Sequence, residues 1–88
     1  MTERKVTVIN SVGLHARPAT YFIQKANSYK SSIQVKCGDR HANAKSLLGV
    51  LSLGIEKDSV VILEAEGIDE NEAVEGLEKL IMKGCNEE

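Results

Sequence analysis

The chain is 88 residues long, with 42% hydrophobic and 27% charged residues and a formal net charge of −2. This length favours one domain, residues 1–88, and the composition is typical of a globular protein rather than a disordered one. The small negative charge disfavours nucleic-acid binding, which needs a basic surface. No apolar run approaches the ~20 residues of a membrane-spanning helix, and the N-terminus lacks the apolar segment of a secretory signal. We therefore expect a cytoplasmic protein that binds neither nucleic acid nor membrane.

The first third of the chain predicts a strand, a turn and a helix. Apolar and polar residues alternate over 5–9, which is typical of a strand. Residues 10–13 are polar and contain a glycine, so we expect a turn there. From Ala16 the apolar period changes to that of a helix, and this spacing predicts a helix of about three turns that ends near Asn27.

The middle of the chain predicts a hairpin and a short helix. An alternating strand opens at Ser31 and Ser32 and runs to Cys37, and the Gly38-Asp39 turn leads into a return strand over 40–44. Ser46 precedes the apolar run 47–51, which predicts a brief helix with Ser46 as its N-cap and Gly54 as its end.

The last third predicts one more strand and one more helix. Residues 60–66 alternate, with Val61, Leu63 and Ala65 expected in the core. Asp69 and Glu72 fit an acidic variant of the capping box at the start of the helix. The apolar stripe of this helix is Ala73, Val74, Leu77, Leu80 and Ile81, and we expect Gly84 to end it. Glu70, Glu72 and Glu75 are expected on its solvated face.

The resulting order is βαββαβα. Four short strands with helices between them predict an α+β fold, a two-layer open-faced sandwich with a four-stranded antiparallel sheet and three helices on one face.

Two cysteines and two histidines are the candidates for metal or redox chemistry. Cys37 and Cys85 are far apart in sequence and form no CxxC motif, so we expect free thiols, with a disulfide or a metal pair as the alternatives. His41 follows the hairpin turn and is expected to be an exposed strand residue. We expect no metal and no cofactor.

The most informative segment is Gly13-Leu14-His15-Ala16-Arg17-Pro18-Ala19. A histidine directly before a helix lies beside backbone N–H groups that lack intrahelical partners, and these donors with the helix dipole favour an anion. Pro18 suits the first helical turn, and Arg17 provides a planar fork for phosphate oxygens. This combination suits a reversible phosphohistidine. The alternative is that His15 only caps the helix and Arg17 is solvated surface.

The sequence resembles the histidine-containing phosphocarrier (HPr) family of the bacterial phosphoenolpyruvate:sugar phosphotransferase system. The segment 13–19 is similar to the phosphorylation signature of that family, and the segment 44–54, Ala-Lys-Ser-Leu-Leu-Gly-Val-Leu-Ser-Leu-Gly, is similar to its second signature. The similarity extends over essentially the whole chain, including the βαββαβα order.

The resemblance implies a phosphoryl carrier and not an enzyme. It implies that enzyme I phosphorylates His15 on Nδ1 at the expense of phosphoenolpyruvate, that Arg17 stabilises the phosphate, and that enzyme IIA domains receive the group. Ser46 corresponds to a serine that an HPr kinase/phosphorylase modifies in many relatives, and the phosphoserine form acts with a catabolite control regulator. A homologous regulatory protein has glutamine in place of His15, so the carrier form is expected here.

The short apolar helix is the expected docking surface for partners. Leu47, Leu48 and Leu51 cannot all be buried by so short a helix, so we expect some of them to contact partner proteins. Leu48 and Leu51 stand where many relatives have methionine or isoleucine, and Val12 stands where many have a polar residue that could bond to the histidine.

Two other functions remain open from the sequence. The chain could be a purely regulatory co-repressor module that acts through phosphoserine, or a small ligand-binding α+β domain. We expect a monomer, and the sequence does not indicate which sugar is transported, because that choice belongs to the enzyme II components.

Overall fold

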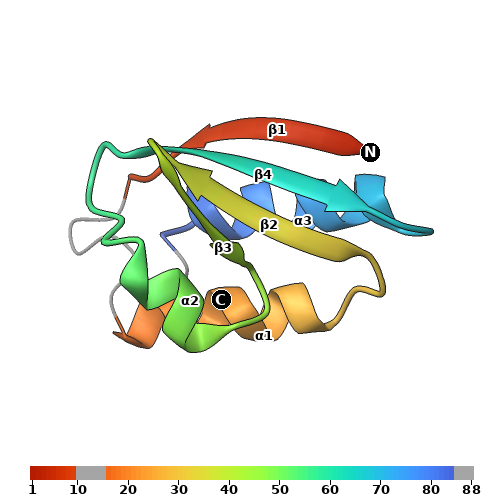
Figure 1. Ribbon diagram of the computed structural model, residues 1–88, viewed down its shortest axis with the longest axis horizontal. Coiled ribbons are helices and arrows are strands. Elements are labelled where there is room, and N and C mark those ends of the chain that lie inside the picture. The colour runs from red at the N-terminus through yellow and green to blue at the C-terminus, as the bar shows by residue number, and fades with distance from the viewer. Residues whose placement is uncertain (10–15, 85–88) are drawn as a thin grey trace.

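The computed structural model describes residues 1–9 and 16–84 of the chain. Its elements follow the predicted order: β1 (Thr2–Thr7), α1 (Ala16–Asn27), β2 (Ser32–Cys37), β3 (Arg40–Asn43), α2 (Leu47–Ser52), β4 (Val60–Glu66) and α3 (Glu70–Met82). The helices lie on one side of the sheet, so the fold is the predicted open-faced sandwich (Figure 1). No helix in the described part of the chain is long and apolar enough to cross a membrane.

The sheet has four antiparallel strands in the order β1-β4-β2-β3. The central strand β4 pairs Val61 with Val6 of β1 and Leu63 with Val35 of β2. Because side chains alternate across a strand, this register places the apolar residues of neighbouring strands on the same face.

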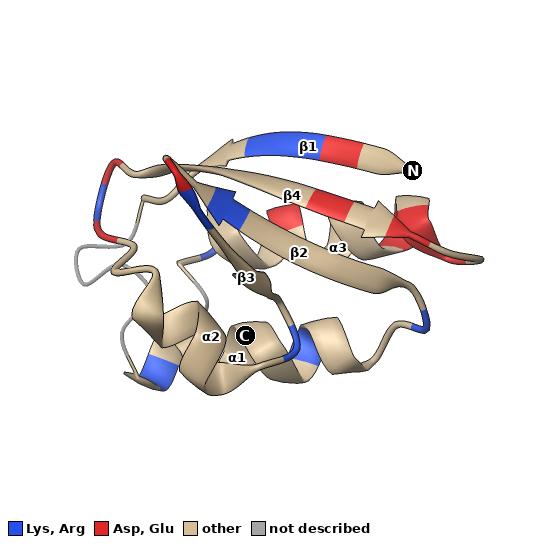
Figure 2. Cartoon of the chain, in the orientation of Figure 1, with Lys and Arg blue, Asp and Glu red and all other residues tan. Residues whose placement is uncertain are grey.

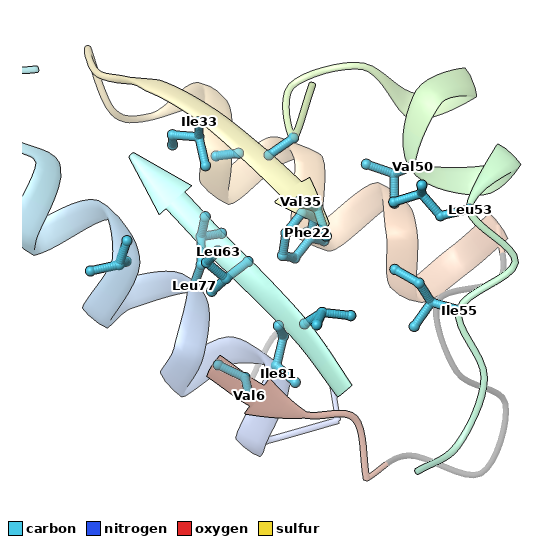
Figure 3. Close-up of a cluster of buried hydrophobic side chains, with 14 of the residues drawn as sticks. Val6, Phe22, Ile33, Val35, Val50, Leu53, Ile55, Leu63, Leu77 and Ile81 are labelled. Carbon is cyan, nitrogen blue, oxygen red and sulfur yellow. The ribbon is translucent and has the colours of Figure 1, made fainter. Parts of the chain in front are cut away.

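The core lies between that face and the helices (Figure 3). Phe22 of α1 and Leu77 of α3 are completely buried, and they meet the apolar face of the sheet there. The chain has no tryptophan and only one phenylalanine, so aliphatic side chains fill most of this layer. The predicted core residues Val61, Leu63 and Ala65 are buried in it.

The first strand differs from its prediction in both bounds. It begins at Thr2 and ends at Thr7, whereas the alternation predicted a strand over 5–9. Thr2, Glu3 and Arg4 pair with β4. These three residues are polar, so apolar alternation along the sequence does not identify them as part of a strand. Val8 lies beyond the strand but still exchanges backbone hydrogen bonds with Asp58 and Ser59, and it is fully buried.

The other boundaries agree closely with the predictions. The helix from Ala16 to Asn27 and the strand from Val60 to Glu66 have the expected ends. Strand β2 begins at Ser32, one residue after the predicted start, and Gly38 makes the hairpin turn with a φ of 62°. The return strand ends at Asn43 rather than at residue 44, although the amide of Ala44 still donates to the carbonyl oxygen of Ile33 at 2.9 Å.

The capping box predicted at α3 is wrong. Asp69 is the N-cap residue, but its side chain makes no capping hydrogen bond. Its carboxylate instead accepts hydrogen bonds from the backbone amides of Lys30 and Ser31, both at 2.9 Å, and from the Ser31 hydroxyl at 2.5 Å. The aspartate is therefore used to tie the loop before β2 to the start of α3.

The prediction for the acidic residues of α3 holds for Glu72 and Glu75, which are exposed, but not for Glu70. The Glu70 carboxylate accepts hydrogen bonds from the Thr2 hydroxyl at 2.7 Å and from the Gly67 amide at 3.1 Å. It also pairs with the N-terminal amine at 3.1 Å. Glu70 thus joins the start of β1 to α3.

Several predictions fall on residues 10–15 and 85–88, which lie outside the described residues. These are the turn over 10–13, the positions of Val12 and His15, and the thiol of Cys85. Cys37 is described, and it is a free, partly buried thiol.

Candidate functional site

The described part of the phosphorylation signature forms the first turn of α1. Ala16 is the first helical residue, and Arg17 is exposed. Pro18 lies within the first turn, where it disrupts no intrahelical hydrogen bond. The backbone amides of a first turn have no intrahelical acceptors, so this end of a 12-residue helix favours a negative charge. His15 directly precedes this turn in the sequence and lies outside the described residues.

The second signature forms α2, which packs against α1 (Figure 1). Ser46 has the extended backbone of an N-cap, with φ −108° and ψ 116°, and its hydroxyl accepts a hydrogen bond from the Gly49 amide at 3.1 Å. The Ser46 carbonyl oxygen accepts the first helical hydrogen bond, from Val50, at 2.9 Å. The prediction of Ser46 as an N-cap is confirmed.

Three side chains hold the segment before Ser46 in place. The Asn43 side chain accepts a hydrogen bond from the amide of Lys45 at 2.8 Å, which closes a local turn. The ammonium group of Lys45 donates to the carbonyl oxygen of Tyr29 at 2.8 Å, and the Asn27 side chain donates to the Lys45 carbonyl oxygen at 3.4 Å. The approach to Ser46 is therefore tied to the C-terminal end of α1.

Sequence reasoning found only part of this arrangement. An asparagine two residues before Lys45 is a recognisable turn signal in the sequence. The contacts of Asn27 and Lys45 join residues 18 positions apart, and no local pattern predicts them. The same is true of Arg40, whose guanidinium donates to the carbonyl oxygen of Ser52 at 3.1 Å and so supports the C-terminal end of α2.

The three leucines of α2 differ in exposure. Leu48 has 81% of its surface exposed, whereas Leu47 and Leu51 are half-buried and pack against the core. An exposed leucine of this size next to two half-buried ones gives α2 a small apolar surface. The expectation that these leucines are not all buried is met, with Leu48 as the most accessible of them.

Among the residues that the structure describes, the remaining candidates form no metal site. His41 is exposed on β3, as predicted, and it lies opposite Lys36 of β2. Within residues 1–9 and 16–84, no group of three or more His, Cys, Asp or Glu side chains could hold a metal ion. The candidate functional groups in the described residues are therefore the start of α1, with Arg17, and the hydroxyl of Ser46.

Comparison with known proteins decides which family has this arrangement. Residues 2–83 match the family model described as "PTS HPr component phosphorylation site". The chain belongs to the HPr family. HPr proteins are phosphocarriers of the phosphotransferase system, and they carry a phosphoryl group rather than catalyse a reaction of their own.

Solved structures of HPr proteins have the same fold. A crystal structure of HPr from Thermoanaerobacter tengcongensis is 44% identical, with a TM-score of 0.94, and the match covers 100% of this chain and 99% of that one. The phosphocarrier protein HPr of Bacillus anthracis is 37% identical, with a TM-score of 0.86 over 89% of this chain and 93% of the other.

A related structure is described as a catabolite repression protein. Crh of Bacillus subtilis, described as a domain-swapped dimer, is 38% identical, with a TM-score of 0.76 over 96% of this chain and 97% of the other. The family thus contains both phosphocarriers and a protein described by its role in catabolite repression.

Proposed function

We propose that this chain accepts a phosphoryl group from enzyme I on His15 and transfers it to sugar-specific enzyme IIA domains. The observation that supports this most is the full signature from Gly13 to Ala19 at the start of a helix, in a chain of the HPr family. This function requires a cytoplasmic protein. Any Mg²⁺ that the reaction of phosphoenolpyruvate needs is held by the donor enzyme and not by this chain.

The transfer step needs one nucleophile and one anion site. A lone pair on the Nδ1 atom of His15 attacks phosphorus, the bond from phosphorus to enzyme I breaks, and an N–P bond forms. The three phosphoryl oxygens keep their negative charge, and the exposed guanidinium of Arg17 together with the amides of the first turn of α1 stabilises it. The reverse sequence of bonds delivers the group to the next protein.

Mass spectrometry tests this function directly. The protein is incubated with phosphoenolpyruvate and enzyme I, and we expect one acid-labile phosphate per chain in the native protein. His15→Ala abolishes this label, while the matched variant His41→Ala retains it, because His41 is the only other histidine. Acid-labile phosphate on the His15→Ala protein, or none on the native one, contradicts the proposal.

We further propose that Ser46 is a regulatory phosphorylation site for an ATP-dependent HPr kinase/phosphorylase. In this form the protein also serves as a partner of a catabolite control regulator. The similarity to Crh supports this second role, and the presence of His15 favours a carrier that is regulated over a module that is only regulatory. Incubation with the kinase and ATP tests it: acid-stable phosphate is expected on the native protein and absent from Ser46→Ala.

Leu47, Leu48 and Leu51 are proposed as the docking surface for enzyme I and enzyme IIA domains. This surface lies on α2, which packs against the helix that begins beside His15. A small apolar contact suits a carrier, because weak interfaces below about 1,200 Å² in total allow rapid exchange between partners.

A further inference from the structure

Gly49 of α2 lies in close contact with the Ser46 hydroxyl and with strand β3. Its backbone amide donates a hydrogen bond to Ser46 Oγ at 3.1 Å. A Cβ atom on Gly49 would lie 3.2 Å from Ser46 Oγ and 3.2 Å from the Cβ atom of Ala42 on β3, both closer than an ordinary van der Waals contact. The missing side chain of Gly49 therefore leaves a small space that Ser46 and Ala42 border.

The backbone of α2 does not require a glycine at position 49. Gly38 and Gly54 have positive φ values of 62° and 63°, whereas Gly49 lies within the helix and has no positive φ. Glycine is among the poorest helix formers, and a helix of six residues has little stability of its own. What glycine provides here is the space beside it, either for packing against Ala42 or for access to the Ser46 hydroxyl.

The two neighbours of this space differ in how far they can move. Ala42 belongs to β3, a four-residue strand at the edge of the sheet, so a shift of a few tenths of an ångström there disturbs only its pairing with β2. Ser46 is held more firmly: its amide donates to the Asn43 carbonyl oxygen at 3.0 Å, and its carbonyl oxygen accepts from Val50 at 2.9 Å. Its hydroxyl cannot move away from a methyl group on residue 49 without losing the hydrogen bond from the amide of the same residue. The contact that cannot relax is therefore the one with Oγ.

Phosphorylation of Ser46 needs free space around Oγ. A lone pair of Oγ forms a bond to the γ-phosphorus of ATP, the bond from that phosphorus to the oxygen of ADP breaks, and the hydroxyl proton passes to a base of the kinase. The phosphorus must first come within about 3–3.5 Å of Oγ, in line with the bond that breaks. The Gly49 amide already occupies one side of the hydroxyl of this half-buried serine, and a methyl group at 3.2 Å would occupy more of it.

The side chains of α2 affect access to Ser46 through their volume and not through charge. α2 contains no charged side chain, and Figure 2 shows its ribbon entirely in tan. The ammonium group of Lys45, which precedes Ser46, is bonded to the Tyr29 carbonyl oxygen. The residues of α2 therefore influence an incoming phosphoryl group through the space that they leave.

We propose that Gly49 is a specificity-determining residue for the phosphorylation of Ser46. Its amide fixes the direction of Oγ, and the absence of a side chain keeps Oγ open to the phosphoryl group of ATP on the kinase. This inference rests on the proposed phosphorylation of Ser46 and adds the residue that makes this serine a competent acceptor. A single methyl group at position 49 should slow the transfer even though the hydroxyl and its helix remain.

Steady-state kinetics of the HPr kinase/phosphorylase with ATP test the proposal. The native protein and Gly49→Ala are compared as substrates, and mass spectrometry locates acid-stable phosphate on Ser46. Gly49→Ala should lower kcat at least about tenfold, because the phosphorus no longer reaches Oγ in line. The KM for the protein should stay within about twofold of the native value, since the methyl group lies beside Oγ and β3 and leaves the exposed Leu48 unchanged.

A second substitution separates access to Ser46 from packing. Ala42→Gly removes the atom that the new methyl group meets on β3, so Gly49→Ala combined with Ala42→Gly keeps the contact with Ser46 and loses the one with β3. The double variant should have a higher Tm than the two single variants predict by addition, because the contact with β3 is relieved. Its kcat should nevertheless stay as low as that of Gly49→Ala. Ala42→Gly alone is the matched control and should keep the native kcat. If Gly49→Ala alone does not fold, the double variant takes its place.

Three results would overturn the inference: a native kcat for Gly49→Ala, a kcat that Ala42→Gly restores, or a change confined to KM. The second result would show that a displaced α2 causes the defect and that Gly49 serves packing alone. If the native protein is phosphorylated on Ser46 and the variant equally well, only the role of Gly49 fails. If the native protein itself receives no phosphate on Ser46, the proposed regulation fails and the role of Gly49 fails with it.

Discussion

At the scale of single residues, two neighbouring carboxylates at the start of α3 hold distant segments of the chain. Asp69 binds the loop before β2, and Glu70 binds the start of β1. Gly67 lies close to the first of these contacts, because a side chain there would meet Ser31 at 2.6 Å. The start of α3 thus depends on a glycine and two ionised carboxylates.

These carboxylates predict an acid-sensitive fold. Hydrogen bonds from the Ser31 hydroxyl and the Lys30 amide lower the pKa of Asp69 below its usual 3.8, and bonds from Thr2 and Gly67 lower the pKa of Glu70 from 4.5 to about 2. Because both folded-state values are lowered, the stabilisation is fully present above about pH 4.5 and decreases as the pH falls toward about 2.

Denaturation between pH 7 and pH 2 measures this loss. Asp69→Asn should lower the Tm by several degrees at neutral pH and flatten the decline in acid, since an amide cannot accept from all three donors as a carboxylate does. The control is Glu72→Gln, an exposed carboxylate of the same helical turn. If Asp69→Asn melted like Glu72→Gln at every pH, the contacts of Asp69 would contribute nothing to stability.

The guanidinium of Arg17 is expected to affect transfer and not folding. It is exposed in the first turn of α1, so its removal leaves the core intact. Arg17→Ala should slow phosphorylation of His15 by about tenfold to a hundredfold, the effect of losing about 1.5–3 kcal/mol from a hydrogen bond to a charged group. Arg17→Lys should recover only part, because a lysine cannot bind two phosphate oxygens with a planar fork.

Rapid-quench kinetics with phosphorylated enzyme I measure these rates, and thermal melting verifies the fold. The comparison of Arg17→Lys with Arg17→Ala separates charge from geometry. Equal rates for the native protein and Arg17→Ala would show that the residue is only part of the solvated surface.

At the scale of elements, α2 combines a serine N-cap with an exposed apolar surface. It has only six residues, so its stability depends on Ser46 at one end and on contacts with α1 and β3. Leu48 and Ser46 lie two residues apart in sequence, and a charge added at Ser46 therefore changes the edge of the surface that Leu48 offers.

The exposed leucine should contribute to docking without contributing to folding. Leu48→Asp removes an apolar side chain that is mostly in water, so we expect a change in Tm of no more than a few degrees. Binding to enzyme I or an enzyme IIA domain should weaken at least several-fold. Leu47→Asp should weaken binding and also lower stability, because Leu47 packs against the core. Calorimetry gives the affinities, and unchanged binding by a folded Leu48→Asp protein would exclude this surface.

A negative charge on Ser46 should slow association with enzyme I more than it changes the free energy of unfolding. Ser46→Ala removes the cap and should cost about 1 kcal/mol of the free energy of unfolding, whereas Ser46→Asp keeps an acceptor and should cost less. Ser46→Asp should nevertheless slow phosphorylation of His15 by enzyme I, with a smaller defect in high salt. Phosphoserine should act more strongly, since it adds about −1.5 to −2 charges. A phosphoserine protein that accepts phosphate at the native rate would leave Ser46 as a helix cap only.

At the scale of the whole molecule, stability depends on one mainly aliphatic layer, in which Phe22 is the only fully buried aromatic side chain among the described residues. Phe22 is fully buried in this layer. Phe22→Ala should lower the free energy of unfolding by about 3–5 kcal/mol, a large part of the 5–15 kcal/mol typical of a domain. Urea denaturation measures this cost, and Tyr21→Ala, next to it on the same helix but only half-buried, is the control. Similar costs for the two variants would show that the layer is not centred on Phe22.

Much of the fold could be predicted because its elements have local signals. The apolar period identified α1 and α3, the alternation identified β2 and β4, and Ser46 identified the start of α2. The first strand was the exception: its polar half is stabilised by pairing with β4, and pairing partners distant in sequence leave no local pattern.

The sequence by itself determined the order of the elements, the core positions of the periodic elements such as Val61, Leu63 and Leu77, and the candidate residues His15, Arg17 and Ser46, because each depends on a motif or on a period of a few residues. It did not predict the burial of Ile55, which lies between α2 and β4. Only the tertiary structure decided the roles of Asp69, Glu70 and Lys45, each of which has a partner between 16 and 69 residues away. From the sequence alone, a carboxylate or an ammonium group is expected to be solvated. The donor or acceptor that it bonds with depends on how distant segments of the chain pack together.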